Sequence, residues 1–379
     1  MKILYITHYA GLGGANNALL HLSHSLKEMG HECVILFPKD GAAVTAAEDL
    51  GLSTKIIKNI QWAGPIEKGL HYRLRLLHIM QINAFALREL IPYIRSEGFD
   101  LIHTNTSLPY IGALAARKLS IPHIWHVREN LSFYGYDYMY GASYARKLYS
   151  EASAVIAISA YIKDYLENTY GVTGNVHVVY DGIPDMPEIT PVPDPDGRFR
   201  LMYAGGISEG KGVRDVLKAS EILKNRGYSD RIRIKMNLGR RDAHRDIWDF
   251  FEDRGLSEIV ATGDYGDMRD ERTHFDCALM CSKDEAFGLV TSESMRDGLM
   301  VIGADSGATP ELITDGETGL LYTQGSPESL ADRIIYAMEH LEIREPIIRN
   351  ARARFIENYT DTINRDSVLS LYRKALEGK

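Results

Sequence analysis

Residues 277–295 read CALMCSKDEAFGLVTSESM, a short apolar run followed by a loop and the start of a helix. An apolar run of this length, bounded by a turn, is typical of a buried strand. We expect the strand to end at Cys281 and the helix to begin near Leu289. Gly288 lies where a missing side chain lets a ligand approach the backbone. The backbone amides of Phe287–Val290, aided by the helix dipole, are then suited to bind a phosphate.

The same alternation of apolar runs and helical patterns extends along the chain on both sides of this unit, which predicts βαβ units and parallel sheets. Residues 183–197, IPDMPEITPVPDPDG, interrupt it with five prolines, which neither helices nor central strands tolerate. The 379 residues also exceed the roughly 250–300 at which a single core stops growing. We therefore predict an α/β chain of two doubly wound, Rossmann-like domains facing a cleft. The predicted parts are a first domain at 1–185, a Pro-rich linker at 186–198, a second domain at 199–355, and a C-terminal helix at 356–379 that packs back on the first domain.

Two carboxylates flank the proposed phosphate site, Glu285 on the loop and Glu293 about one turn into the helix. Carboxylates would repel a phosphate, so their use must be to accept hydrogen bonds from hydroxyl groups at either end of a diphosphate. A nucleotide sugar has such hydroxyls on its sugar and on its ribose. The alternative is that both residues only cap the helix and line a solvated face.

Composition excludes several classes of protein. The net charge of −8 argues against a nucleic-acid binder, and three scattered cysteines indicate a reducing compartment without disulfides. No residue cluster suggests a metal site or a bound cofactor, and no stretch has the roughly 18–20 apolar residues of a membrane helix. We expect a cytoplasmic protein that is either free or peripheral at the inner face of the plasma membrane.

A glycine-rich turn, Gly11-Leu12-Gly13-Gly14, follows the first predicted strand. Glycines at this place let backbone amides approach an anion. As a dinucleotide fingerprint the turn fails, because Asn16 replaces the third glycine and no acid ends the next strand. A tight turn without a ligand is the alternative.

The Glu-x7-Glu pattern with FGLV inside it resembles the signature of family 4 retaining glycosyltransferases, which have the two-domain GT-B fold. Other motifs of that family recur in order over nearly the whole chain. They are Gly13-Gly14, His126 at the end of IWHV, Asp181-Gly182-Ile183, Lys211-Gly212, Gly307-Ala-Thr-Pro310-Glu311 and Gly316 with Thr318-Gly319-Leu320.

The resemblance implies a role for each matching position in a retaining, metal-independent transfer from a UDP- or GDP-linked sugar. Glu285 would bind sugar hydroxyls, Glu293 the ribose diol, and Lys211 the diphosphate. The resemblance places His126 against the transferred sugar, although a histidine at a strand end is often structural. With Glu285 and Lys211 it makes the catalytic set. The donor-binding set is Gly13, Gly14, Gly206, Lys211, Arg240, Phe287, Gly288, Leu289, Val290 and Glu293.

Two positions depart from the family pattern. Gly206 stands where family members usually have an arginine that binds the diphosphate together with the lysine. Asp181 replaces the usual asparagine. Loss of one charge-assisted contact removes about 1.5–3 kcal/mol. Candidates to replace the arginine are Arg240, Arg241 and Lys283.

The acceptor is a sugar or a lipid-linked glycan, as the resemblance implies, in surface polysaccharide or glycoconjugate synthesis. Arg128 could meet an acceptor phosphate, and Tyr134 could stack on a sugar. Residues 70–95 carry four arginines among apolar residues, a pattern of helices that lie on anionic membranes, but also of an ordinary crossover helix. Two other functions stay open: a nucleotide-sugar epimerase on the same fold, and a catalytically inactive partner that binds nucleotide sugars.

Overall fold

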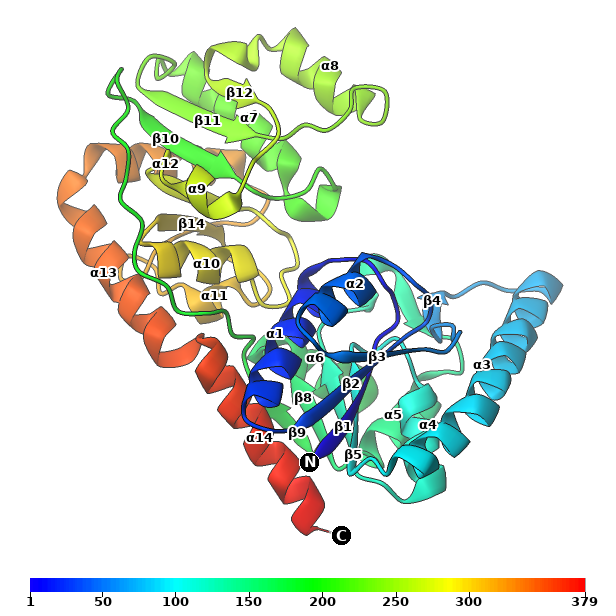
Figure 1. The fold of residues 1–379 in the computed structure, drawn as a ribbon. Helices are drawn as coiled ribbons and strands as arrows, with labels where there is room; N and C mark the ends of the chain where they lie inside the picture. Colours follow the sequence, from blue (N-terminus) through cyan, green and yellow to red (C-terminus); the bar gives the residue numbers. More distant parts are fainter. Residues whose placement is uncertain (379) are drawn as a thin grey trace. The chain divides into compact units, whose positions relative to one another are not determined.

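The computed structural model describes residues 1–378, which divide into two compact units (Figure 1). Unit 1 comprises residues 1–182 and 361–379, and unit 2 comprises residues 183–360. The chain therefore passes from one unit to the other twice, at Gly182–Ile183 and at Thr360–Asp361. None of the helices within residues 1–378 combines the length and the apolar character needed to span a membrane.

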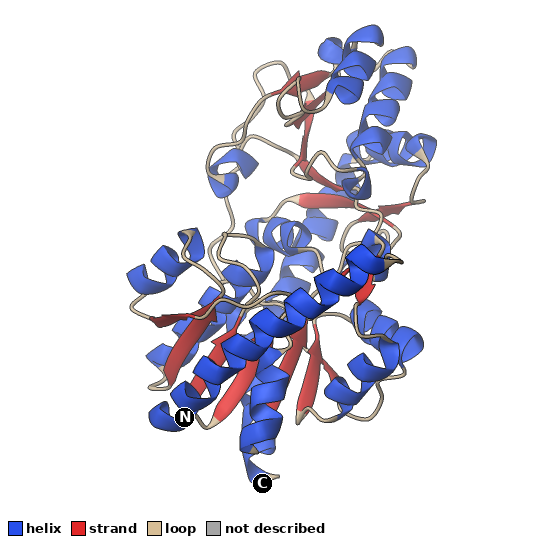
Figure 2. Ribbon diagram, turned by 90° about the vertical axis from the view of Figure 1, so that its right-hand side faces the viewer, coloured by secondary structure: helices blue, strands red, loops and turns tan. Residues whose placement is uncertain are grey.

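Unit 1 is built on a seven-stranded parallel sheet with the strand order β3-β2-β1-β5-β6-β8-β9. Its central strands are apolar on both sides because helices cover both faces, as Figure 2 shows. The strands are β1 (Lys2–Ile6), β2 (Glu32–Phe37), β3 (Ser53–Ile56), β5 (Leu101–Asn105), β6 (His123–Val127), β8 (Ala154–Ala157) and β9 (Val176–Val178); β4 (Ala63–Pro65) and β7 (Tyr136–Tyr138) form a separate antiparallel pair.

The helices of unit 1 that pack on β1 form two groups, one on each face of the sheet. Ile3 and Tyr5 point to one face with α1, α2 and α14, whereas Leu4 and Ile6 point to the other with α3 and α4. The C-terminal helix thus contributes to the core of unit 1, through Tyr372 among others. The helices are α1 (Gly14–Glu28), α2 (Ala42–Asp49), α3 (Leu70–Glu97), α4 (Ile111–Leu119), α5 (Ala142–Ser150), α6 (Ala160–Tyr165) and α14 (Asp361–Glu377), with short helical turns η1 (Ser132–Tyr134) and η2 (Leu166–Tyr170).

Unit 2 repeats this architecture with a six-stranded parallel sheet in the order β12-β11-β10-β13-β14-β15. Its Pro-rich beginning is bonded to the rest of the unit. The amides of Ile189 and Val192 donate to the carbonyls of Asp297 and Thr273. The strands are β10 (Phe199–Tyr203), β11 (Ile232–Met236), β12 (Val260–Thr262), β13 (Cys277–Met280), β14 (Met300–Ala304) and β15 (Leu320–Tyr322). The helices are α7 (Val213–Asn225), α8 (Arg245–Asp253), α9 (Met268–Arg272), α10 (Leu289–Asp297), α11 (Thr309–Leu312), α12 (Pro327–Glu339) and α13 (Leu341–Asn358), with η3 (Glu209–Lys211) and η4 (Leu256–Glu258).

The predicted fold class is confirmed, because each unit is a doubly wound parallel sheet. In each sheet the strand order reverses beside a central strand: between β1 and β5 in unit 1, and between β10 and β13 in unit 2. Ligands of such folds bind outside the carboxyl ends of the strands at these switch points.

Candidate functional site

Lys211 and Glu285 meet at the switch point of unit 2. Lys211 follows β10 and Glu285 follows β13, and the lysine Nζ lies 3.0 Å from the glutamate Oε2. The lysine side chain keeps 37% of its surface exposed and the glutamate 15%. A cation that is paired yet accessible can turn toward an incoming phosphate, so the two residues predicted from separate motifs form one site.

The loop that carries Lys211 is pressed against the loop after β13. Gly212 has a φ of +76°, and a side chain there would lie 2.0 Å from the carbonyl oxygen of Cys281. The amide of Lys283 donates to the carbonyl of Gly210 at 2.8 Å. Glycine at position 212 is therefore required both by its backbone angle and by the close approach of the two loops.

The loop that carries Glu285 is held from its other side by the Gly307 turn. A Cβ at Gly307 would lie 2.6 Å from the backbone nitrogen and oxygen of Glu285. The amide of Ala308 donates to the Glu285 carbonyl at 2.7 Å, and the Ser306 hydroxyl to the Ser282 carbonyl at 2.9 Å. The Gly-Ala-Thr-Pro-Glu motif thus acts by positioning the Glu285 backbone.

Helix α10 begins at Leu289, as predicted, and directs its first amides away from the helix body. Gly288 precedes it with a φ of +109°, a conformation that a side chain would strain. The first N–H groups of Leu289 and Val290 have no acceptor within the helix, so with the helix dipole they form an anion site. Phe287 is buried and packs edge-on against Tyr359 at 5.7 Å, which fixes the turn before the helix.

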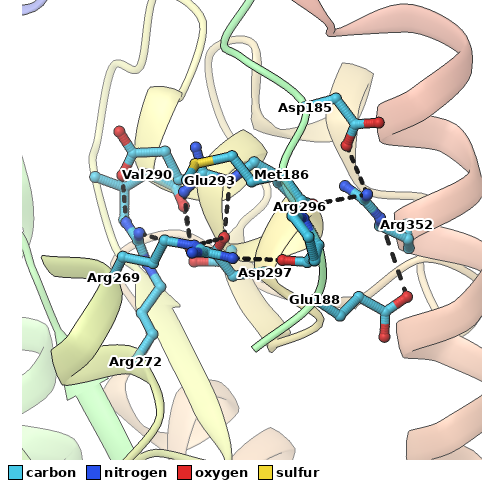
Figure 3. A network of polar contacts seen from close by, with 12 residues as sticks. Asp185, Met186, Glu188, Arg269, Arg272, Val290, Glu293, Arg296, Asp297 and Arg352 are labelled. Atoms are coloured by element: carbon cyan, nitrogen blue, oxygen red, sulfur yellow. Dashed lines mark hydrogen bonds and ion pairs between the residues drawn. The ribbon is translucent and has the colours of Figure 1, made fainter. Parts of the chain in front are cut away.

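Glu293 is paired with Arg272, a residue that the sequence analysis did not single out (Figure 3). The Arg272 side chain is only 1% exposed, whereas Glu293 keeps 31% exposure. Arg272 also contacts the fully buried Asp297 at 2.9 Å, and Arg296 contacts Asp297 at 2.7 Å. Arg272 lies in the charged stretch MRDER, which is typical of a surface helix, so nothing in the sequence indicated its burial.

The structure gives no support to Arg240 or Arg241 as a replacement for the missing arginine. Arg240 is 83% exposed and pairs with Asp242 at 2.6 Å, and Arg241 pairs with Glu252 at 2.6 Å. Neither side chain is directed to the switch point by these contacts. Acidic residues that follow β11 hold both arginines in this structure, and Arg240 as a donor-binding residue stays a prediction.

Lys283 is better placed as a second cation. Its amide bonds to Gly210 in the Lys211 loop, and its side chain is 37% exposed with Glu209 at 3.8 Å. Gly206 itself is not sterically required, because an added Cβ would meet nothing within 4 Å.

The glycine-rich turn of unit 1 is held by Asn16, the residue that breaks the dinucleotide fingerprint. Its amide donates to the carbonyls of Tyr9 at 3.1 Å and Gly11 at 2.9 Å, and its oxygen accepts from the Thr7 hydroxyl at 2.7 Å. Helix α1 begins at the last residue of this turn, Gly14, with Gly13 as the N-cap residue, and Asn16 lies in the first turn of the helix. The turn therefore presents backbone at the carboxyl end of β1, where the predicted phosphate contact lies.

His126 and Arg128 occupy the interior of unit 1. Arg128 pairs with Asp181, donates from Nε to Asn105 at 2.8 Å, and lies with Nη2 3.3 Å from Nδ1 of His126. An arginine only donates hydrogen bonds, so Nδ1 of His126 accepts and its proton is on Nε2, a buried atom with no partner. Burial lowers the pKa of His126 well below its ordinary value, with Arg128 and His103 contributing in the same direction.

Both side chains, predicted to meet a sugar and an acceptor phosphate, are enclosed in this structure. His126 has no exposed surface, so in this structure its ring does not reach a ligand. Arg128 is buried in an ion pair and is not offered to an acceptor phosphate. The pair also explains the departure at position 181, since a carboxylate there neutralises Arg128. Tyr134, in contrast, lies 59% exposed in η1, with Phe133 edge-on at 5.3 Å.

Two further residues lie at the switch point of unit 1. His8, after β1, places Nδ1 2.9 Å from the Thr106 hydroxyl after β5, and Thr106 has an unusual φ of +78°. Glu129, after β6, accepts from the amide of Ser107 at 2.7 Å and from its hydroxyl. A strained non-glycine residue at a switch point is typical of a functional loop. The one signal for these residues in the sequence is their position just after predicted strands.

Residues 1–378 hold no group of three or more histidine, cysteine or acidic side chains arranged to bind a metal ion.

Known proteins similar to this chain are glycosyltransferases. The family described as Glycosyltransferase Family 4 matches residues 12–185, and the one described as Glycosyl transferases group 1 matches residues 187–354. An uncharacterized glycosyltransferase of Methanocaldococcus jannaschii is 26% identical over 72% of this chain and 74% of its own length. An alpha-maltose-1-phosphate synthase of Mycolicibacterium smegmatis is 25% identical over 74% and 80%. A crystal structure of HepE from Anabaena in complex with UDP has a TM-score of 0.81 at 21% identity, covering 98% of this chain and 99% of that one.

Proposed function

Because the chain belongs to the family 4 glycosyltransferases, we propose that it moves a sugar from a nucleoside diphosphate donor to a sugar or lipid-linked glycan acceptor. The transferred sugar is linked to UDP or GDP in the donor. The HepE complex with UDP makes UDP the first nucleotide to test. The reaction belongs to the synthesis of a surface polysaccharide or glycoconjugate, in the cytoplasm.

The observation that carries this proposal is the 3.0 Å pair of Lys211 and Glu285 beside the start of α10. The ammonium group and the first amides of α10 supply positive potential for a diphosphate. The adjoining carboxylate, neutralised by the same lysine, accepts hydrogen bonds from sugar hydroxyls. Glu293, one turn further along α10, binds the ribose hydroxyls, and Arg272 orients it.

The transfer we propose retains the anomeric configuration. The bond between the anomeric carbon and the leaving diphosphate oxygen breaks, and the acceptor hydroxyl oxygen bonds to the same face of that carbon. The acceptor proton passes to the leaving diphosphate. Lys211 and the α10 amides stabilise the negative charge that grows on the diphosphate, so a metal ion is not needed for this purpose.

The test combines donor binding with turnover. UDP and GDP are compared by thermal shift, since a ligand at 100 times its Kd stabilises the native state by about 2.7 kcal/mol. Sugar transfer is then measured with excess EDTA, and we expect it to continue. If EDTA abolishes transfer and Mg²⁺ or Mn²⁺ restores it, Lys211 and the α10 amides do not stabilise the leaving diphosphate without a metal ion. Release of an isomerised nucleotide sugar would indicate an epimerase, and binding without transfer or slow donor hydrolysis would indicate an inactive partner.

A further inference from the structure

Helix α3 carries an apolar surface that its packing on unit 1 does not explain. Its buried residues, among them Ile79, Ala86 and Leu90, lie on one side of the helix. The first turns, residues 70–78, contain no buried residue. Figure 1 shows these turns standing away from the sheet of unit 1.

The outward side of these turns is nevertheless rich in leucine. Leu70, Leu74 and Leu77 are 70%, 53% and 54% exposed and follow the i, i+4, i+7 spacing of one helix face. Leu70 is nine residues from the buried Ile79, which at 3.6 residues per turn is two and a half turns, so the two lie on opposite sides. Phe85, 64% exposed, continues the outward side. An apolar stripe opposite the packed side points to a partner outside the unit.

The charges around this stripe are basic. Residues 66–88 contain Lys68, Arg73, Arg75 and Arg88 against Glu67, a net charge of 4 − 1 = +3, while the whole chain carries −8. The Arg88 guanidinium lies 5.2 Å from the centre of the Phe85 ring, so a cation and an aromatic ring share the surface. Apolar side chains flanked by cations match the boundary between anionic headgroups and acyl chains.

An apolar groove of about 470 Å³ adjoins the stripe. Met80, Ala84 and Leu87 form its α3 wall, and Tyr110 and Leu114 line its other side. Met80 is itself 51% exposed, so the groove and the stripe form one continuous apolar surface.

We propose that the exposed side of residues 66–88 binds the surface of a membrane that contains anionic lipids, with α3 lying in the plane of the headgroups. The inference goes beyond the donor chemistry proposed above, because it uses no residue of the donor site. It would place unit 1 at the bilayer surface, where a lipid-linked acceptor is reached.

Cosedimentation with vesicles tests the proposal directly. The full chain is mixed with vesicles of phosphatidylcholine alone or of phosphatidylcholine with phosphatidylglycerol, at low and at high salt. We expect binding to the anionic vesicles only, weakened at high salt, since the Debye length falls from about 10 Å at 0.1 M to about 3 Å at 1 M. Each cation near such a surface strengthens binding by about fivefold, so Arg73→Gln with Arg88→Gln should weaken binding to the anionic vesicles roughly 25-fold.

The apolar contribution is tested with Leu74→Glu and Leu77→Glu together. We expect at least about tenfold weaker binding to anionic vesicles. The matched control is Leu341→Glu with Ile356→Glu, which changes residues 67% and 47% exposed in unit 2 and should leave vesicle binding unchanged. Retained thermal shift by UDP or GDP shows that each variant is folded and keeps its donor site.

Three outcomes would overturn the proposal: no binding to anionic vesicles at low salt, equal loss in the control, or unchanged binding in the Leu74/Leu77 variant. If that variant instead splits a dimer of the wild-type chain in solution, the stripe is an interface between two copies. Failure here leaves the donor assignment intact, because nucleotide binding and sugar transfer to a soluble acceptor are measured separately.

Discussion

Arg272 holds Glu293 from inside unit 2, with 1% of the arginine side chain exposed and 31% of the glutamate. The glutamate therefore keeps free surface for a ligand while its position is fixed by a buried cation. Asp297, fully buried at 2.9 Å from the same arginine, anchors that cation independently of Glu293. A binding residue and its support are thus separable, and substitutions can address them one at a time.

Glu293→Gln should weaken binding of the free nucleoside diphosphate without unfolding the protein. Arg272 keeps its contact with Asp297, so no buried charge is left unpaired. A lost hydrogen bond to a charged group is worth about 1.5–3 kcal/mol, so the Kd measured by calorimetry should rise tenfold or more.

Arg272→Met is the contrasting change and should mainly lower stability. Removing one partner of a buried ion pair typically costs about 3–5 kcal/mol. Urea unfolding of both variants separates the two roles. Equal Kd values for wild type and Glu293→Gln would remove Glu293 from the donor site.

Lys211 and Glu285 should show strong coupling in nucleotide binding. Lys211→Met leaves the Glu285 carboxylate unneutralised where the diphosphate binds, so UDP affinity should fall by more than tenfold. Adding Glu285→Gln removes that negative charge, and the double variant should bind UDP more tightly than Lys211→Met alone, although sugar transfer stays lost in both. Calorimetry of UDP binding to the wild type, the two single variants and the double variant gives the coupling energy between Lys211 and Glu285. Strictly additive effects would mean that the 3.0 Å pair has no part in binding the diphosphate.

The stability of unit 1 should fall as the pH drops below 6.5. Burial lowers the pKa of His8 from 6.5 to about 4 and that of His123 to about 3, and it lowers those of His103 and His126 as well. A depressed pKa means that the unfolded chain takes up the proton first. The stability is therefore fully present above pH 6.5 and is lost as the pH falls toward 4.

Each such histidine contributes a slope of about 1.4 kcal/mol per pH unit. Urea unfolding followed by tryptophan fluorescence measures this, because Trp62 and Trp125 lie buried in unit 1. His8→Asn, which can keep the contact to Thr106, should reduce the slope by the share of one histidine. An unchanged slope between pH 6.5 and 5 would show that His8 is not held neutral in the native state.

The sequence predicted what depends on local pattern. Strand β13, Gly288 and the start of α10 follow from one continuous stretch, and the parallel sheets follow from the alternation of strands and helices. The pairing of Arg272 with Glu293 joins residues 21 apart and was not predictable, since MRDER has the composition of a solvated helix. The burial of His126 was missed for another reason. Its strand, β6, lies between β5 and β8 with both faces covered, so even the polar residue at its end is enclosed.

Gly206 stands where the family pattern has an arginine. A Cβ added at Gly206 would meet nothing within 4 Å, and φ at this glycine does not lie in the left-handed region. Gly206→Arg should therefore fold normally and add a cation at the carboxyl end of β10. If the diphosphate binds there, UDP affinity should rise about tenfold, the value of one charge-assisted hydrogen bond.

Gly263→Arg is the matched control, since a Cβ added at Gly263 would also meet nothing within 4 Å, but Gly263 follows the edge strand β12. It adds the same charge to the chain and should leave the Kd unchanged. Lys283→Ala completes the comparison. If Lys283 serves in place of the arginine, its removal should weaken UDP binding in the wild type, and Gly206→Arg should restore most of the loss. Arg240→Ala should have no effect, because Arg240 is already paired with Asp242. Equal gains from Gly206→Arg and Gly263→Arg would show a nonspecific effect of net charge and would remove the carboxyl end of β10 from the diphosphate site.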